Sequence, residues 1–378
     1  MSLHGRLSRT HGVLAATVAA ALTGPIAGRG QVASSSSGAA ARPVIAVVAP
    51  GKSPAFDAMP KSLRGRVDIV RVNVNALDAQ EDILKRATGL LWIPTAGSPS
   101  GGTPSETLAK VWPKMPKVTW VHSFSAGVEV LLPFGEACVA PTNGRIVLTN
   151  GRGAFSSSLA EYSLAAMLYF NKQLKRVERN REAGIWDNFV MDTMEGKTVG
   201  LVGYGSIGKS CGRAAKGAFG CRVVALRRRS GDGDEGGPAD RVYGTEEKEA
   251  FFQACDFVVC SLPSTPATQK YIAAAEIGAM KPSAVLVSIG RGAAIDETAL
   301  AEALAAGAIR GAALDVFTAE PLPKASPFWG LSNVLLTSHN ADFTADYFEL
   351  GWRVWGENFD RFSAGKPLST PVDIGQGY

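Results

Sequence analysis

The segment TVGLVGYGSIGKS, residues 198–210, constrains the fold of this chain more than any other stretch. A short apolar run precedes three glycines in the pattern G-x-G-x-x-G, and a helix-compatible stretch follows them. In such strand–turn–helix units the first glycine permits the turn, the second lets the backbone approach a pyrophosphate, and the third lets helix and strand pack closely. The free N–H groups at the helix start attract phosphate. We therefore predict a dinucleotide-phosphate site formed by Gly203, Gly205, Ser206, Ile207 and Gly208.

This segment opens a series of six short apolar runs separated by helical stretches, ending with NVLLTSH. The series predicts an α/β fold with a Rossmann-type doubly wound parallel sheet over residues 151–341. An earlier series, from PVIAVVAP to IVLTN, predicts a smaller, flavodoxin-like α/β substrate domain over residues 43–150. The aromatic helical segment 342–378 is too short to be a domain, so we assign it to the smaller one. Between the two series, one long helix is expected from about Ser157 to Ala183.

Residues 1–42 are rich in Arg, Ser and Ala and contain no Asp, Glu or Lys. That composition predicts a transit peptide for an organelle, either plastid or mitochondrion. The apolar run 13–22 also fits a secretory signal, and a disordered tail on a cytoplasmic protein is the remaining alternative. The segment is too short and too alanine-rich to span a bilayer, so no membrane association is expected.

The formal net charge of +5 is concentrated in this same leading segment, which contains four arginines. Without them the chain is nearly neutral, which removes the main electrostatic argument for nucleic-acid binding. The five cysteines are odd in number and form no C-x-x-C pair. We interpret them as buried free thiols and predict no metal site.

The run VVALRRRS begins about twenty residues after the glycines. The second strand of a dinucleotide unit usually ends in an acidic residue that binds the ribose 2′-hydroxyl, but here that position is Arg227. A guanidinium binds a 2′-phosphate through paired, charge-assisted hydrogen bonds. The sequence therefore favours NADP over NAD, with Arg227 and Arg228 as leading ligands and Arg229 and Ser230 assisting. A solvated basic turn, neutralised by the acidic residues that follow, is the alternative.

Three chemically active side chains follow the strands of the second series. Beyond the leading segment only His122 and His339 can titrate near neutral pH. His339 follows the last strand, Arg291 follows another, and DVFTAEP places Asp315 and Glu320 after a third. Because the carboxyl ends of parallel strands meet at one edge of a sheet, these groups are expected to lie together where such folds bind ligands.

Taken in order, GYGSIG, SIGRG, DVFTAEP and TSH resemble the motifs of the D-isomer-specific 2-hydroxyacid dehydrogenase family, over nearly the whole chain after residue 43. The resemblance implies that His339 exchanges a proton with the substrate and that Glu320 orients His339 and raises its pKa. It implies that Arg291 binds the carboxylate and carbonyl oxygen of the substrate. It also implies contacts to the cofactor from Leu262, Pro263, Ile289, Gly290 and Asp315.

The stretch WVHSFSAGVEVLL resembles the substrate-domain loop of the same family. Ser125, Ala126 and Gly127 would turn backbone N–H groups toward the substrate carboxylate. His122, just before this loop, is interpreted as a core or interface histidine. Ser288 and Ser338 stand where the family often has Asn and Pro, and neither change removes a reacting group.

Together, the arginine run and the resemblance predict an NADPH-preferring reductase of small 2-keto acids, with glyoxylate and hydroxypyruvate as favoured substrates, and the resemblance implies a homodimer. Two alternatives remain. One is an NAD-linked member of the family acting on phosphoglycerate or formate. The other is a non-enzymatic, nucleotide-sensing protein similar to the co-repressors that share the fold.

Overall fold

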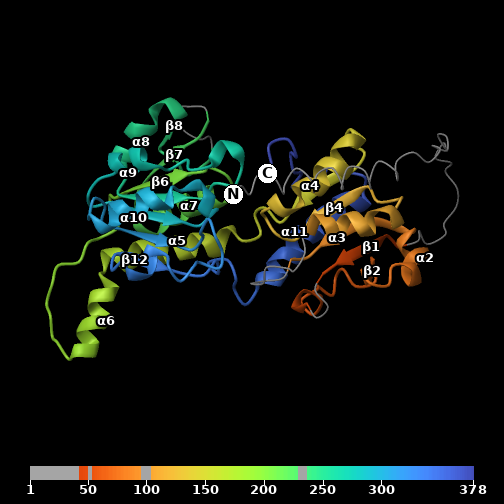
Figure 1. Cartoon of the computed structure of the whole chain (residues 1–378), viewed down its shortest axis with the longest axis horizontal. Helices are drawn as coiled ribbons and strands as arrows, with labels where there is room; N and C mark the ends of the chain where they lie inside the picture. The colour runs from red at the N-terminus through yellow and green to blue at the C-terminus, as the bar shows by residue number, and fades with distance from the viewer. Residues whose placement is uncertain (1–41, 50–52, 95–103, 229–235) are drawn as a thin grey trace. The chain divides into compact units, whose positions relative to one another are not determined.

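The computed structural model describes residues 42–49, 53–94, 104–228 and 236–378 (Figure 1). The chain divides into two compact units, Met1–Ala154 with Phe348–Tyr378 and Phe155–Tyr347. Both divisions fall a few residues later than the expected ones. The expected targeting segment, residues 1–42, lies outside the described residues except for Arg42. The proposed cofactor ligands Arg229 and Ser230 also lie outside them.

The first unit contains a five-stranded, fully parallel sheet in the order β2-β1-β3-β4-β5, which is the flavodoxin-like order. Its strands are β1 (Val44–Val48), β2 (Asp68–Arg71), β3 (Ala87–Trp92), β4 (Trp120–Ser123) and β5 (Val147–Asn150). Its helices are α2 (Glu81–Leu84), α3 (Pro104–Val111), α4 (Leu132–Phe134) and all but the first residue of α11 (Tyr347–Ser363). The expected small parallel domain is confirmed.

Alternate residues of these strands pack against different helices, as the period of two requires. Val44, Ala46 and Leu90 belong to a core shared with α3 and α4. Trp120 points to the other face, where its ring stacks on Trp355 of α11 with centroids 5.5 Å apart. The C-terminal aromatic helix therefore completes the core of the first unit.

The second unit contains a seven-stranded parallel sheet in the order β12-β11-β10-β9-β6-β7-β8. Its strands are β6 (Thr198–Val202), β7 (Arg222–Leu226), β8 (Arg241–Tyr243), β9 (Phe257–Cys260), β10 (Val285–Ser288), β11 (Gly311–Leu314) and β12 (Val334–Leu336). This confirms the predicted Rossmann-type sheet. The strand order reverses between β6 and β9, and in such folds the ligand site lies at the carboxyl ends of the strands beside that reversal.

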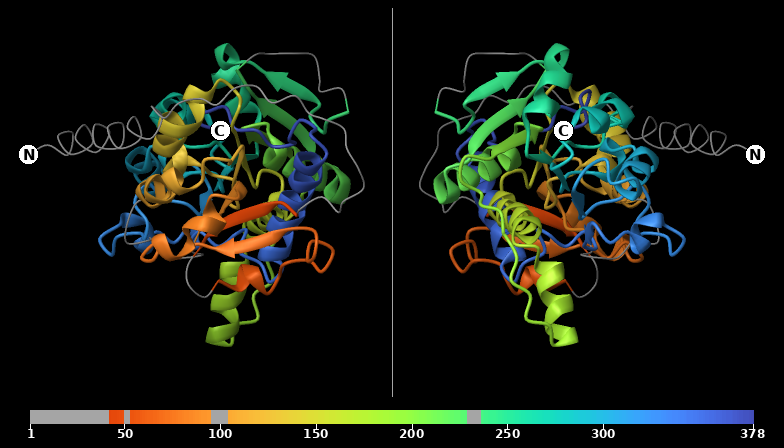
Figure 2. Two further views of the ribbon diagram at one scale, coloured as in Figure 1. Left: turned by 90° about the vertical axis from the view of Figure 1, so that its right-hand side faces the viewer. Right: turned by 90° about the vertical axis from the view of Figure 1, so that its left-hand side faces the viewer.

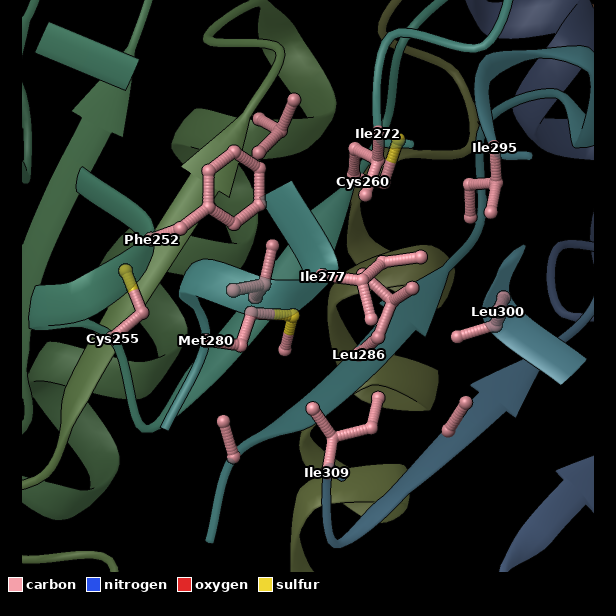
Figure 3. Close-up of a cluster of buried hydrophobic side chains, with 14 of the residues drawn as sticks. Phe252, Cys255, Cys260, Ile272, Ile277, Met280, Leu286, Ile295, Leu300 and Ile309 are labelled. Carbon is pink, nitrogen blue, oxygen red and sulfur yellow. The ribbon is translucent and has the colours of Figure 1, made fainter. Parts of the chain in front are cut away.

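Helices cover both faces of this sheet. They are α5 (Ser156–Asn171), α7 (Ser206–Phe219), α8 (Lys248–Ala254), α9 (Ala274–Ala279) and α10 (Glu297–Ala305), and a further helix of this unit, α6 (Leu174–Ala183), follows α5 without covering the sheet. Figure 3 shows the core on one face, where Phe252 of α8, Ile277 of α9 and Leu300 of α10 meet Leu286 of β10. On the other face, α7 approaches the sheet so closely that a Cβ at Gly212 would touch Leu201 and Val223.

Two local features differ from the sequence prediction. The larger sheet has seven strands, whereas the sequence predicted six. The edge strand β8 was missed because it is only three residues long. The expected single helix is two helices, α5 and α6, separated at Gln173, whose backbone is left-handed with φ of 50°. Lys172 and Gln173 donate side-chain hydrogen bonds to the carbonyl oxygens of Asp192 and Val190. These bonds fix the break between the two helices to the segment around residues 190–192, which follows α6. The helix α6 projects from its own unit (Figure 2).

All five cysteines are buried and free, as predicted. Within the described ranges, no helix is long and apolar enough to cross a membrane. The same ranges contain no group of three or more His, Cys, Asp or Glu side chains arranged to hold a metal ion.

Candidate active site

The glycine turn lies between β6 and α7, where the sequence places it. Gly203 has a φ of 95°, a conformation that favours glycine. A Cβ at Gly208 would collide with the carbonyl oxygen of Gly203, so the helix can approach the strand only without a side chain there. A Cβ at Gly205, by contrast, would have no atom within 4 Å. The backbone at Gly205 is therefore open on the side where a pyrophosphate would lie, and Ser206 and Ile207 form the first turn of α7 beyond it.

The arginine run begins beside this turn. Val202 pairs with Leu226 across β6 and β7, so Gly203 and Arg227 follow neighbouring positions of the two strands. Leu226 is buried, whereas Arg227 and Arg228 are exposed. The strand therefore ends in two exposed guanidinium groups at the edge of the sheet that carries the glycine turn.

On the other side of the reversal, the segment after β9 packs against the segment after β10. The Ser261 hydroxyl donates to the carbonyl oxygen of Gly203 at 3.0 Å. A Cβ at Gly290 would collide with the backbone of Leu262, which shows how closely these two predicted cofactor ligands approach each other. Ile289 is 4% exposed, and its N–H donates to the carbonyl oxygen of Cys260 at 3.0 Å. The glycine cradle and the closely packed strand ends fit a bound dinucleotide.

Arg291 precedes a short 3₁₀ turn, Gly292–Ala294, and is half-buried. Its Nη1 donates to the carbonyl oxygen of Gly290 at 2.9 Å. A Cβ at Gly292 would collide with the backbone of Phe317. The turn that carries Arg291 thus packs directly on the segment that leads to Glu320.

His339 and Glu320 form an ion pair. The Nδ1 of His339 lies 2.7 Å from Oε2 of Glu320, and Oε1 of Glu320 accepts from the Phe317 N–H at 2.9 Å. A carboxylate only accepts hydrogen bonds, so Nδ1 is the protonated donor in this pair. The other ring nitrogen, Nε2, is consequently the atom that can take up and release a proton.

The charges of this group act on one another. The hydrogen bond to Glu320 raises the pKa of His339 above its ordinary value of 6.5, although burial and the charge of Arg291 oppose the shift. Burial tends to raise the pKa of Glu320, but the hydrogen bonds from His339 and Phe317 outweigh it and keep that pKa below its usual value. Arg291 is close enough to lower the pKa of both groups. The structure therefore brings together the three side chains that the sequence singled out.

Asp315 follows β11 and is only 1% exposed. Its Oδ1 accepts from the Thr337 hydroxyl at 2.6 Å and from the Asn340 N–H at 3.1 Å, and its Oδ2 accepts from the Ala341 N–H at 3.2 Å. Most of its acceptor capacity is therefore used within the segment that carries His339. Contact with a nicotinamide carboxamide stays a prediction for the one acceptor position left on Oδ2.

Comparison with known proteins agrees with this geometry. Residues 164–341 match the family described as D-isomer specific 2-hydroxyacid dehydrogenase, NAD binding domain. Glyoxylate/hydroxypyruvate reductase B of an Enterobacter species is 30% identical over 299 residues, which cover 75% of this chain and 86% of that protein. The chain belongs to the D-isomer-specific 2-hydroxyacid dehydrogenase family. It is an NAD(P)-dependent enzyme of that family.

Solved structures of this dehydrogenase family share the fold. A family member from Aeromonas salmonicida is 27% identical, with a TM-score of 0.71 over 88% of this chain and 100% of that one. An NADPH-dependent glyoxylate/hydroxypyruvate reductase from Sinorhizobium meliloti, in complex with citrate, is 25% identical. Its TM-score is 0.65, over 89% of this chain and 98% of that one.

The loop predicted to bind substrate follows β4 in the first unit of this dehydrogenase. The carbonyl oxygens of Ser125 and Ala126 accept from the Gly151 N–H at 3.0 Å and from Asn150 Nδ2 at 2.7 Å. Among described residues, the N–H groups of Ser125, Ala126 and Gly127 have no hydrogen-bond partner. The loop is thus fixed through its carbonyl oxygens, while its role in substrate binding stays a prediction.

His122 lies in the core of the first unit, in agreement with its interpretation from sequence. It is 0% exposed, its Nδ1 lies 2.7 Å from Thr149 Oγ1, and its Nε2 has no partner within the described residues. Burial lowers its pKa to about 3. His122 is therefore neutral at physiological pH and is part of the packing.

Sequence reasoning missed three residues near His339. Thr337 lies beside Asp315 because Leu314 pairs with Leu336, a register between distant strands that no local sequence pattern reveals. Asp342, three residues after His339, has a half-buried carboxyl group. Burial raises the pKa of this carboxyl, although the charges of His339 and Arg291 lower it. Tyr162 of α5 contacts Thr337 and has no local signal in the sequence.

Proposed function

We propose that this dehydrogenase reduces small 2-keto acids, with glyoxylate and hydroxypyruvate as favoured substrates, to D-2-hydroxy acids, and that it prefers NADPH. The observation that carries the proposal is the His339–Glu320 ion pair beside Arg291, at the strand edge that also carries the glycine turn. The relatives named glyoxylate/hydroxypyruvate reductase support this substrate class.

Reduction of a 2-keto acid adds a hydride to the carbonyl carbon and a proton to the carbonyl oxygen. A bound reduced nicotinamide supplies the hydride. His339 in its imidazolium form donates the Nε2 proton to the oxygen as negative charge develops there, and becomes neutral. Its Nδ1–H remains hydrogen-bonded to Glu320 throughout, so the carboxylate stabilises the protonated ring and fixes its orientation. The C–H and O–H bonds of the product are then complete.

Arg291 supplies the positive charge that the substrate needs. Its guanidinium can bind the keto acid carboxylate through two parallel hydrogen bonds and can polarise the neighbouring carbonyl group. Polarisation makes the carbonyl carbon a better hydride acceptor. We assign substrate orientation to Arg291 and proton transfer to His339.

The cofactor preference rests on the end of β7. Arg227 and Arg228 are exposed beside Gly203, and the usual carboxylate is absent from the first position after the strand. A 2′-phosphate would be attracted there, whereas a carboxylate would repel it. We therefore propose that these two arginines select NADPH, with NADH as a weaker substrate.

We also propose that two copies associate through the projecting α6 segment. Several apolar side chains on and after α6 are solvent-exposed, a pattern that marks association surfaces. They are Leu174 at 42%, Ile185 at 58%, Trp186 at 99%, Val190 at 88% and Met191 at 42% exposure. Sedimentation of the wild-type protein should give a dimer, and Trp186→Ser with Val190→Ser should give a monomer of unchanged thermal stability.

The proposed reaction is tested by following NADPH absorbance at 340 nm with glyoxylate, hydroxypyruvate, phosphohydroxypyruvate and pyruvate. We expect turnover with the first two and a loss of about 10²–10⁴-fold in His339→Gln. Turnover with NADH and the phosphorylated substrate alone would assign the enzyme to the phosphoglycerate type. Tight NADPH binding without turnover of any keto acid would favour a nucleotide-sensing protein.

A further inference from the structure

A row of three hydrogen-bonded side chains connects α5 to the segment that carries His339. The Tyr162 hydroxyl lies 2.8 Å from Thr337 Oγ1, and Thr337 Oγ1 lies 2.6 Å from Asp315 Oδ1. Asp315 in turn accepts hydrogen bonds from the N–H groups of Asn340 and Ala341, the two residues after His339. The row therefore ends on the backbone that directs the imidazole.

The direction of the hydrogen bonds in this row follows from chemistry. The Asp315 carboxylate only accepts, so the single hydroxyl proton of Thr337 is donated to it. Thr337 must then accept from Tyr162. Burial raises the pKa of Tyr162 to about 12, so this phenol keeps its proton at any working pH. Bonds that run in one direction strengthen one another, and each donor depends on the next.

The backbone at His339 needs such support. Its φ is 52°, in the left-handed region that residues other than glycine seldom adopt. Conformations of this kind persist only where surrounding contacts hold them. Here the His339 N–H donates to the Asp315 carbonyl oxygen at 2.7 Å, and the following two N–H groups donate to the Asp315 carboxylate. Rotation of the Asp315 side chain would release both of the latter bonds.

We propose that Tyr162 and Thr337 are positioning residues for His339. Through Asp315 they keep the backbone of His339 in the left-handed conformation that places its imidazole on Glu320. Neither residue touches the imidazole itself. The kinetic part of the test rests on the proposed function, but the protonation of His339 can be followed without any substrate.

The first measurement is an NMR titration of the histidine side chains in the substrate-free, full-length protein, with His339→Gln to assign the signal. Because His122 is neutral down to about pH 3, it does not interfere. Thr337→Val removes the hydroxyl but keeps the shape. We expect the His339 midpoint to fall by about 0.5–1 pH unit as its bond to Glu320 loosens. Tyr162→Phe should give a smaller fall in the same direction.

Two further variants separate positioning from general loss of structure. Thr337→Ser keeps a hydroxyl and should restore most of the wild-type midpoint. Ser163→Ala removes a buried hydroxyl from the neighbouring position of α5, where it donates to the Leu159 carbonyl oxygen and does not contact Thr337. It should leave the midpoint unchanged. An unchanged midpoint in both Thr337→Val and Tyr162→Phe, or an equal shift in Thr337→Ser, overturns the proposal.

The second measurement is the pH profile of kcat for keto acid reduction. Thr337→Val should lower kcat about tenfold, leave the KM for NADPH unchanged, and move the alkaline fall in rate to lower pH. A decrease in melting temperature with a wild-type pH profile would show a purely structural role and contradict the proposal. If wild-type protein reduces no keto acid, the proposed function fails, and the NMR midpoints alone decide the positioning role.

Discussion

His339 and Glu320 are joined by a hydrogen bond of 2.7 Å, which is the largest cause of the raised pKa of His339. Reduction uses the protonated imidazole, so the rate should hold below this pKa and fall as the pH rises through it. Glu320→Gln removes the negative charge, and the His339 pKa should move down toward 6.5. We expect keto acid reduction to drop about 10²-fold or more and its alkaline limb to shift to lower pH.

A suitable control for this prediction is Glu297→Gln. Glu297 accepts a hydrogen bond of 2.6 Å from the N–H of Thr318, which lies in the same segment as Glu320. Glu297 does not contact His339. Its pH profile should match that of the wild type. If the rate falls at the same alkaline pH in Glu320→Gln as in the wild type, the role given to Glu320 is contradicted.

Gly205 and Gly208 should respond to alanine in opposite ways. A Cβ at Gly205 meets no atom within 4 Å, so Gly205→Ala should fold normally while its methyl group occupies the space a pyrophosphate needs. A Cβ at Gly208 collides with the Gly203 carbonyl oxygen, so Gly208→Ala should lower the melting temperature. Fluorescence titration should show a rise in the NADPH Kd of about tenfold, or 1.4 kcal/mol, for Gly205→Ala. An equal loss of stability in both variants would argue against a phosphate cradle.

The placement of Arg291, Glu320 and His339 could be predicted because it depends on one general rule. Each follows a short apolar strand, and parallel strands bring their carboxyl ends to one edge of the sheet. The pairing of Leu314 with Leu336, which sets Asp315 beside Thr337, is a matter of register between strands that are distant in the sequence. No local pattern encodes it. Tyr162 reaches Thr337 only through the packing of α5, which the sequence does not specify residue by residue.

The sequence prediction missed two features of the fold, the edge strand β8 and the break between α5 and α6, and both were missed for the same reason. Arg241–Tyr243 is too short to show the alternation of a strand and is recognised only because it pairs with β7. The break at Gln173 interrupts a continuous helical pattern and is held by bonds to residues 190 and 192. In both cases a tertiary contact overrides the local preference of the chain.

The two ends of β7 offer a matched test of cofactor preference. Arg227 lies at the carboxyl end beside the glycine turn, and Arg222, also exposed, begins the strand at the opposite end. Arg227→Asp should lower kcat/KM with NADPH about 10²-fold, because a carboxylate repels the 2′-phosphate, and should leave NADH turnover little changed or improved. Arg222→Asp changes the net charge equally and should leave the ratio of the two cofactors unchanged. An unaltered ratio in Arg227→Asp would exclude this arginine as the selecting group.

His122 should make the fold sensitive to acid. Burial lowers its pKa from 6.5 to about 3, so the folded state binds the proton much more weakly than the unfolded state does. Its contribution to stability is therefore fully present above pH 6.5 and is lost as the pH falls toward 3, by about 1.4 kcal/mol for each pH unit. Urea unfolding of wild type and His122→Gln at pH 7.5 and pH 5 measures this loss. The free energy of unfolding should fall about 2 kcal/mol more in the wild type, since Gln binds no proton. Equal decreases in the two proteins would mean that His122 is hydrated or already charged in the folded state.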